Sequence, residues 1–307
     1  MPPQFAMTLS GVSRVFNGKT VLQDINLAFY YGAKIGVVGE NGAGKSTLLR
    51  IGVGQLPPAR GTVQVLGGTP GDLGLRARIA YMPQRFGLYP DLSVLENLRF
   101  FADLHGLPAH EALPRIRDLL ARTGLTDFEA RRAGQLSGGM MQKLALACAL
   151  VSSPRAMFLD EPTTGVDPLA RRAFWQLLEQ VRAEGVAILY ATANMDEAER
   201  CDRVVVLREG RMFRQGTPEA LAHAGDMRLM AVSGPRARHL RRAVRALPGV
   251  SFAFPVGTRL HVWLAPGVTP AAFTAELAQL DPGLTATAAR PTLHDVNLRD
   301  LTQVPAT

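Results

Sequence analysis

A glycine-rich loop near the start of the chain combines residue types that bind phosphate. In "KIGVVGENGAGKSTLL", an apolar run at Ile35–Val38 precedes the pattern G-x-x-x-x-G-K-[ST], and a segment that favours helix begins at Lys45. Glycines let backbone N–H groups close around a phosphate, and the helix N-terminus adds its partial positive charge. The predicted phosphate-binding residues are Gly39, Glu40, Asn41, Gly42, Ala43, Gly44, Lys45, Ser46 and Thr47.

Two side chains of this loop indicate magnesium-nucleotide chemistry. We expect Lys45 to reach the β- and γ-phosphates and the Ser46 hydroxyl to take a Mg²⁺ position. The alternative is a glycine turn followed by a chance lysine. The strand-loop-helix context of the motif favours the nucleotide site.

An acidic pair follows another apolar run. "AMFLDEPTTGVDP" predicts a buried strand at Ala156–Leu159, with Asp160 at its tip and Glu161 one residue further. We expect Asp160 to hold Mg²⁺ directly or through water, and Glu161 to orient and deprotonate an attacking water. By itself, such an acidic pair is as typical of a surface turn as of a magnesium site. Together with the glycine loop it predicts a hydrolytic site.

A second candidate phosphate site lies in "LSGGMMQKLALACAL". Ser137, Gly138 and Gly139 are expected to open a long apolar helix whose first N–H groups are free to bind phosphate. Two such sites in one chain imply either two ligands or one site shared between two copies.

Composition limits the classes of protein. The 307 residues include 47% hydrophobic and 20% charged side chains, as in a soluble globular protein of about two domains. No apolar run approaches the ~20 residues of a membrane helix, and the start lacks a secretion signal, so we expect a cytosolic protein.

Cys148 and Cys201 are expected to be reduced packing residues. The net charge of +8 indicates an anionic partner: nucleotide, nucleic acid or a membrane face.

The motifs together resemble the nucleotide-binding subunit of ATP-binding cassette (ABC) transporters, over about residues 5–220. The resemblance implies an α/β P-loop cassette, with a RecA-like core, an antiparallel β subdomain and a helical subdomain at about 91–150. It implies two cassettes head to tail, with ATP and Mg²⁺ between the P-loop of one and Ser137–Gly139 of the other. It also implies an integral membrane permease as partner, and a peripheral location on the cytoplasmic face of the membrane.

Three further positions match the family one at a time. Phe16 corresponds to the aromatic residue on which adenine stacks, although an isolated Phe is more typical of a core. Gln84 corresponds to the glutamine that contacts Mg²⁺ and the attacking water; the alternative is a polar strand cap. Asp167 corresponds to the loop that crosses to the other cassette, and it also suits the N-cap of a helix starting at Pro168.

One position departs from the family. "VAILYATANMDEAERCDRVVVL", residues 186–207, predicts strand, turn, helix, strand. The family has "T-H" after such a strand, and its histidine contacts the γ-phosphate. Aligned through "MDEAE", that histidine falls on Ala193, and Asn194 is a weak substitute donor. The resemblance then implies either slowed hydrolysis in a homodimer or pairing with a different cassette that brings its own histidine.

The remaining residues, 226–307, predict a second domain. The pattern is strand (228–233), helix (235–247), strand (250–256), strand (259–265), helix (269–280), strand (284–290), then a short helix near Pro291. That βαββαβ order predicts a small ferredoxin-like α+β domain. The first helix holds five arginines, which form either a solvated face or a contact with anionic lipid or a partner. The ending "RPTLHDVNLRDL" partly resembles the "P-[ST]-L-E-D-V-F" of drug and antibiotic exporters, departing at His294 and Asn297.

Three functions compete at this point. The first is an ATPase subunit that powers a separately encoded membrane exporter. The second is a soluble cassette ATPase acting on ribosomes or nucleic acid, which only the basic charge supports; we expect no nucleic-acid partner. The third is a nucleotide-gated clamp with little hydrolysis, which the alanine at 193 supports.

Overall fold

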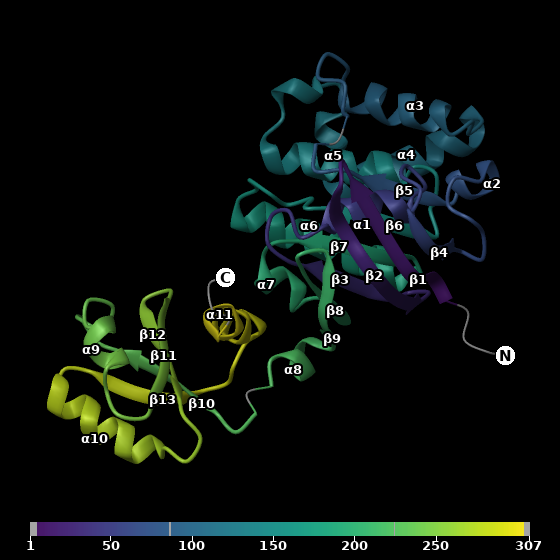
Figure 1. The fold of residues 1–307 in the computed structure, drawn as a ribbon. Coiled ribbons are helices and arrows are strands. Elements are labelled where there is room, and N and C mark those ends of the chain that lie inside the picture. The colour runs from purple at the N-terminus through teal and green to yellow at the C-terminus, as the bar shows by residue number, and fades with distance from the viewer. Residues whose placement is uncertain (1–4, 86, 224, 304–307) are drawn as a thin grey trace. The chain divides into compact units, whose positions relative to one another are not determined.

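The computed structural model describes residues 5–85, 87–223 and 225–303. They divide into two compact units, one ending at Gln215 and one beginning at Gly216 (Figure 1). The sequence places the division at 222–226. A short helix, α8 (Pro218–Leu221), packs against the last helix of the C-terminal unit, so it belongs to that unit. Residues 304–307 of the predicted second domain lie outside the described residues.

A six-stranded sheet is the largest sheet of the N-terminal unit. Its strands are β3 (Lys34–Val38), β5 (Ile79–Met82), β6 (Ala156–Asp160), β7 (Ala187–Thr192), β8 (Arg203–Arg208) and β9 (Arg211–Gly216). The strand order is β5-β6-β7-β3-β8-β9, and the pairs from β5 to β8 are parallel. Every residue of β3, β6 and β7 is buried, as expected for parallel strands covered on both faces. The predicted strands at 35–38 and 156–159 are confirmed, each one residue longer.

A three-stranded antiparallel sheet packs against the glycine loop. It contains β1 (Phe5–Phe16), β2 (Lys19–Tyr30) and β4 (Arg60–Val65) in the order β2-β1-β4. Asn17 and Gly18 join β1 to β2 with φ of 46° and 77°. Two consecutive positive φ values are what a two-residue hairpin turn requires, and Asn-Gly adopts them readily.

Several helices of the N-terminal unit begin at the predicted motifs. α1 (Lys45–Gly52) follows the glycine loop, and α6 (Pro168–Ala183) is capped by Asp167. The region 91–150 contains α3 (Val94–Leu104), α4 (Ala109–Thr123), two 3₁₀ turns (Thr126–Phe128 and Ala133–Gln135) and α5 (Gly138–Leu150) around a core of their own. A short helix, α2 (Leu73–Arg76), precedes β5.

The strand, turn, helix, strand prediction for 186–207 is confirmed: α7 (Met195–Ala198) lies between β7 and β8. Cys148 and Cys201 are buried and unpaired, as predicted. No helix among residues 5–85, 87–223 and 225–303 has the length and apolar character needed to cross a membrane.

The C-terminal unit is a four-stranded antiparallel sheet with helices on both faces. Its elements are β10 (Arg228–Ser233), α9 (Arg241–Arg245), β11 (Val250–Val256), β12 (Arg259–Leu264), α10 (Pro270–Leu280), β13 (Thr285–Ala289) and α11 (Leu293–Gln303). The strand order is β11-β12-β10-β13. The predicted helix at 235–247 is regular only over 241–245. Residues 235–240 form turns in which the N–H of Ala237 bonds the oxygen of Gly234, three residues back, and the N–H of Leu240 bonds the oxygen of Arg236, four residues back.

The two faces of this sheet have separate cores. Met230, Val232 and Val262 point toward α9 and α10, whereas Leu229 and Trp263 point toward the other face, which α11 covers through Val296. Alternation along each strand requires this division. The two central strands, β10 and β12, are therefore buried on both sides, whereas the edge strands β11 and β13 are more exposed.

A buried carboxylate holds α11 on its face of the sheet. Asp295 is 0% exposed, and one carboxylate oxygen lies 2.6 Å from Nδ1 of His261 on β12. The other oxygen accepts from the N–H of Thr292 at 2.9 Å and from its hydroxyl at 2.7 Å. Burial by itself raises the pKa of Asp295, but the His261 and Thr292 contacts outweigh it, so the pKa lies below its ordinary value.

Asp295→Asn is expected to lower the free energy of unfolding of the C-terminal unit by about 1–3 kcal/mol, because buried polar groups lose their partners. Denaturant titration in a Trp175→Phe background, where Trp263 is the remaining tryptophan, measures this loss. A depressed carboxyl pKa stabilises the fold above the ordinary value near ~3.9, and that contribution disappears as the pH falls through the folded-state pKa. The two proteins should therefore converge in acid. Equal stability at neutral pH would contradict the assignment.

Candidate phosphate-binding site

The predicted site residues gather at one edge of the six-stranded sheet. Because β5, β6, β7 and β3 are parallel neighbours in that order, their carboxyl ends lie side by side. Gln84 follows β5, Asp160 and Glu161 lie at the end of β6, Ala193 follows β7 and the glycine loop follows β3. Ligands of open α/β sheets bind beyond the carboxyl ends of the strands.

The backbone of the loop requires glycine at two positions. At Gly39, a Cβ atom would lie 2.5 Å from the oxygen of Leu207. Gly44 has φ of 104°, and a Cβ there would lie 2.6 Å from Cδ2 of Leu22 on β2. The loop is therefore compressed between β8 and β2, which holds its backbone in one shape.

The ammonium group of Lys45 is buried within this loop. The side chain is 4% exposed, and Nζ donates to the oxygens of Gly39 at 2.8 Å and Glu40 at 3.1 Å. Nζ also lies 3.2 Å from Oε1 of Glu161. A phosphate bound in the loop would compete with the Glu161 carboxylate for the same cation.

Asp160 has an unsatisfied oxygen suited to a cation. The residue is 3% exposed, and Oδ1 has no hydrogen-bond partner among the described residues. Burial raises the pKa of Asp160; the Ser46 hydroxyl opposes the rise and the charge of Glu161 adds to it. An orphaned buried carboxylate oxygen beside a hydroxyl fits a Mg²⁺ position. Among the described residues, no group of three or more Asp, Glu, His or Cys is placed to hold a metal ion, so such an ion would depend on phosphate oxygens as further ligands.

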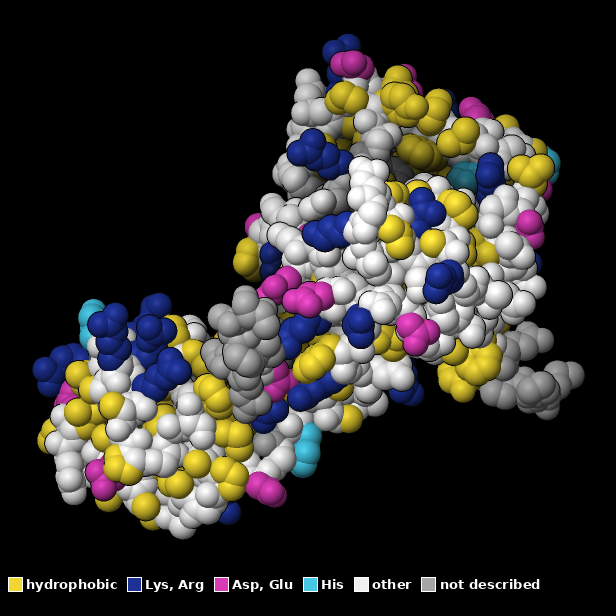
Figure 2. All heavy atoms as spheres, viewed as in Figure 1, with side chains coloured by type: hydrophobic (Ala, Val, Ile, Leu, Met, Phe, Trp, Pro, Cys, Tyr) yellow, Lys and Arg dark blue, Asp and Glu magenta, His cyan; other side chains and the backbone are white. Residues whose placement is uncertain are grey.

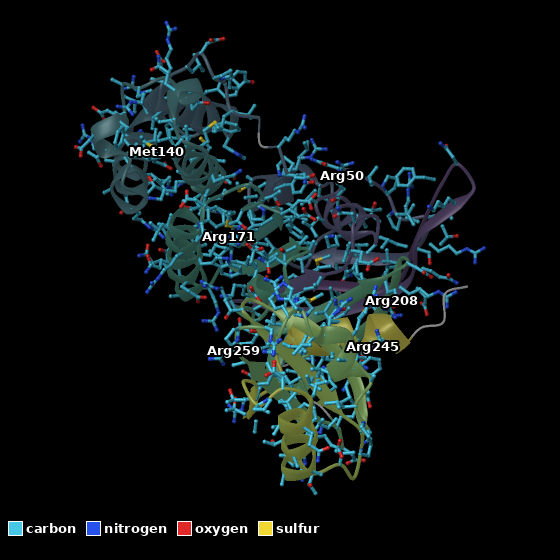
Figure 3. All side chains as sticks on the ribbon, turned by 90° about the vertical axis from the view of Figure 1, so that its left-hand side faces the viewer. Arg50, Met140, Arg171, Arg208, Arg245 and Arg259 are labelled. Carbon is cyan, nitrogen blue, oxygen red and sulfur yellow. The ribbon has the colours of Figure 1, made fainter. Side chains whose placement is uncertain are left out.

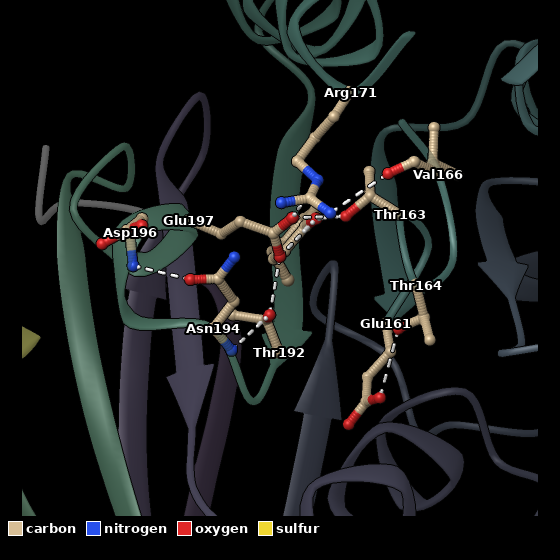
Figure 4. Close-up of polar contacts among 10 residues, drawn as sticks. Glu161, Thr163, Thr164, Val166, Arg171, Thr192, Asn194, Asp196 and Glu197 are labelled. Carbon is tan, nitrogen blue, oxygen red and sulfur yellow. Dashed lines mark hydrogen bonds and ion pairs between the residues drawn. The ribbon is translucent and has the colours of Figure 1, made fainter. Parts of the chain in front are cut away.

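Glu161 occupies a strained backbone position. Its φ is 48°, unusual for a residue with a Cβ atom, and its N–H donates to the oxygen of Ala191 on β7 at 2.9 Å. The hydroxyl of Thr164 lies 3.4 Å from Oε2 (Figure 4). This conformation turns the side chain toward Lys45, and strain of this kind is concentrated at functional sites.

Phe16 and Gln84 are exposed, whereas Lys45 is buried. Phe16 is 39% exposed at the tip of the β1–β2 hairpin, whose Leu22 packs on Gly44, and the guanidinium of Arg14 lies 4.7 Å from its ring centroid. Gln84 is exposed, and no hydrogen bond from its side chain is present among the described residues. No hydrogen bond or ion pair among the described residues joins either side chain to the loop, so their roles toward a nucleotide stay predictions.

The second candidate phosphate site lies at the start of another helix. Ser137 caps α5 by accepting from the N–H of Met140 at 3.3 Å, and Gly138 is exposed. A Cβ on Gly139 would lie 2.3 Å from Cβ of Ala170, so α5 meets α6 at the turn that Asp167 caps. Within the described residues, no hydrogen bond or ion pair joins this segment to the loop around Lys45.

Ala193 is exposed beside the loop. The N–H of Asn194 donates to Oγ1 of Thr192 at 2.9 Å, and its side-chain oxygen accepts from the N–H of Asp196 at 3.0 Å (Figure 4). The Asn194 carbonyl is therefore occupied as the cap of α7, and only its amide group remains to serve as the alternative donor.

A buried network connects this turn to the segment after Glu161. Glu197 is 5% exposed and accepts hydrogen bonds from the hydroxyls of Thr163, Tyr190 at 3.1 Å and Thr192 at 2.6 Å. Arg171 of α6 lies 3.6 Å from the same carboxylate and donates to the oxygen of Val166 at 3.1 Å (Figure 4). One carboxylate thus joins the end of β7, the loop after β6 and the start of α6.

The sequence does not predict the network around Glu197. Asp196, Glu197 and Glu199 look alike in "MDEAE", yet only Glu197 is buried. Its burial depends on β7 and on the loop after β6, which are distant in sequence. The one available signal is that Glu197 lies between Met195 and Ala198, which are both buried.

The fold and this loop define a P-loop nucleotide-binding protein. The family model for "ABC transporter" matches residues 22–164. The probable multidrug ABC transporter ATP-binding protein YbhF of Escherichia coli is 41% identical over 270 residues, covering 86% of this chain and 47% of that protein. The Nod factor export ATP-binding protein I of Rhizobium leguminosarum is 41% identical over 219 residues, covering 70% of each chain.

A solved structure supports the same family. A dimeric structure of the ATP-binding cassette MJ0796, bound to ADP and Pi, matches with a TM-score of 0.62 and 26% identity, over 69% of this chain and 98% of that one. The chain therefore belongs to the ATP-binding proteins of the ABC transporter family, which confirms the resemblance. It spans about half the length of the Escherichia coli relative.

Glu197→Ala is expected to lower the free energy of unfolding of the N-terminal unit by about 1–3 kcal/mol, because three buried hydroxyls and Arg171 lose their shared acceptor. Denaturant titration followed by the fluorescence of Trp175, whose ring centroid lies 4.6 Å from that of Tyr190, measures the change. The matched control is Asp196→Asn, an exposed neighbour, with an expected effect within about 0.5 kcal/mol. Similar effects of the two substitutions would argue against the network.

Proposed function

We propose that this chain binds and hydrolyses ATP to power a separately encoded membrane permease, and that the complex is an exporter. The arrangement of Lys45 between the P-loop carbonyls and Glu161, beside the orphaned oxygen of Asp160, is the observation that carries the proposal. Two relatives support the exporter class: one is a probable multidrug ABC transporter ATP-binding protein, and the other is a Nod factor export ATP-binding protein. A peripheral location on the cytoplasmic face of the membrane follows from such a partnership.

The P-loop residues bind and orient the nucleotide in this proposal. N–H groups of the loop and of the first turn of α1 surround the phosphates, and Lys45 neutralises charge on the β- and γ-phosphates. Ser46, Asp160 and Gln84 are the residues that would hold Mg²⁺. When bound, Mg²⁺ neutralises charge that develops on the phosphate oxygens. The adenine stacks on Phe16. The guanidinium of Arg14 lies over this ring, so it must move away before the base can stack there.

Glu161 acts as the general base. With a phosphate bound, Lys45 turns toward it and releases the Glu161 carboxylate, which is then free to accept a proton from the attacking water. Gln84 orients that water. The three groups proposed as catalytic are thus Glu161, Gln84 and Lys45.

The complete site is proposed to form between two cassettes. Ser137, Gly138 and Gly139 of one cassette would bind the γ-phosphate held by the P-loop of the other, and Asp167 would cross between them. Two features support this: the exposed start of α5 in this chain, and the dimer described for the related cassette. Because Ala193 supplies no donor, hydrolysis in a homodimer is slowed, or the working dimer pairs this chain with a different cassette.

The C-terminal unit is proposed to be a ferredoxin-like accessory domain. Its strand order and antiparallel pairing support that classification. A nucleotide-gated clamp with little hydrolysis is the second candidate function, and the methyl group of Ala193 favours it. A soluble cassette ATPase without a permease remains the third.

Ala193→His is expected to raise ATP turnover, by up to the roughly 10²–10³-fold that one preorganised donor contributes. Glu161→Gln is expected to eliminate turnover while ATP binding persists, because the base is lost but the P-loop is not. Steady-state phosphate release and binding of a fluorescent ATP analogue measure the two quantities. Ala193→Leu, which adds bulk without a donor, is the control for the histidine.

The outcomes separate the candidates. Unchanged turnover in Ala193→His, together with its loss in Glu161→Gln, would show that the missing donor is not limiting. No turnover in any variant, with tight ATP binding, would favour the clamp. Finding a multispanning membrane protein encoded beside this gene and copurifying with the chain would support export. A ribosomal or repair neighbourhood would count against it.

A further inference from the structure

The C-terminal unit contains a long segment without acidic residues. Residues 227–275 include seven arginines and no Asp or Glu. Most of these arginines lie in the segment that connects β10 to β11. This segment contains α9, and its backbone also has helical hydrogen bonds just before and after α9. The N–H groups of Leu240, Val244 and Ala246 each bond a carbonyl four residues back, at 2.9–3.2 Å.

Four of these arginines form one row on the surface. Arg238, Arg241, Arg242 and Arg245, which we call the arginine row, have the i, i+3, i+4, i+7 spacing of a single helix face. All four are exposed, while Ala237 and Val244 are 0% exposed and pack into the core. Figure 2 shows basic side chains gathered over this part of the unit, and Figure 3 labels Arg245.

The charge of the row is not neutralised within the described part of the chain. The neighbouring Arg236 pairs with Asp281 at 2.9 Å, but no ion pair among the described residues involves the four arginines of the row. Asp281, Asp295 and Asp300 are buried, with partners of their own. Like charges three and four residues apart destabilise a helix, so the arrangement costs stability unless an anion relieves the repulsion.

The geometry points to an anionic membrane surface as the partner of the arginine row, and we propose that it binds phospholipid headgroups. The guanidinium group is planar and binds phosphate through two parallel N–H donors, as the chemistry of a headgroup requires. Each arginine near an anionic leaflet adds to the attraction. A lipid partner is favoured over nucleic acid because residues 234–247 contain no Phe, Tyr or Trp on which a base would stack, and His239 is the single aromatic ring among them.

This contact goes beyond the proposed ATPase function. It is a second attachment to the membrane, made by the C-terminal unit itself and independent of a permease. Its strength should fall as salt screens the exposed charges.

Cosedimentation of the full-length protein with vesicles tests the proposal. One set is phosphatidylcholine alone, and the other is phosphatidylcholine mixed with phosphatidylglycerol. The protein is expected to bind the mixed vesicles. Replacing the four arginines of the row by glutamine should reduce apparent affinity at least tenfold, because each charge near an anionic surface contributes about fivefold. The charge-matched control replaces four exposed arginines of the N-terminal unit, at positions 99, 117, 172 and 203, by glutamine and should retain binding.

Other results would overturn the proposal. Equal losses in the row and control variants would mean that only net charge matters. Equal binding to both vesicle types would exclude headgroup charge, and tighter binding to a nucleic acid of mixed sequence than to the vesicles would assign the row to that partner. If the fourfold variant does not fold, the double variant Arg238→Gln/Arg242→Gln provides the same test with fewer substitutions, and its binding should also be weaker. Binding of ATP, measured on the same samples, tests the proposed function separately.

Discussion

The buried ammonium of Lys45 is the constraint on which the phosphate site depends. A desolvated charge is costly unless acceptors surround it. Two carbonyl oxygens of the loop and the carboxylate of Glu161 meet this need, and they do so only because the ends of β3 and β6 lie at one edge of the sheet. The positive φ of Glu161 is part of the same solution, since it directs the carboxylate toward the loop.

A second buried charge organises the neighbouring turn. The carboxylate of Glu197 is the shared acceptor for hydroxyls from three segments, and Arg171 balances it. The exposed methyl of Ala193 therefore lies on a turn whose backbone is firmly placed. Because β7 is the neighbour of β3, a side chain at this position lies at the same edge of the sheet as the P-loop.

In the C-terminal unit, several acids are buried and paired, whereas the arginine row is exposed. The buried carboxylates are engaged in holding helices and loops, as Asp295 holds α11 and Asp281 holds Arg236. These buried acids pair with groups other than the arginine row, and no ion pair among the described residues involves the row.

The sequence alone was enough to predict the P-loop from Gly39 to Ser46, the acidic pair at the end of β6, the buried strands that precede these motifs and the strands of the C-terminal unit. These follow from short-range patterns, because glycine loops, buried strands and caps depend on neighbouring residues. Only the tertiary structure decided the pairing of Lys45 with Glu161, the orphaned oxygen of Asp160 and the burial of Glu197 among three like acids. Strand order and desolvation set these contacts, and both arise from segments that are far apart in the chain.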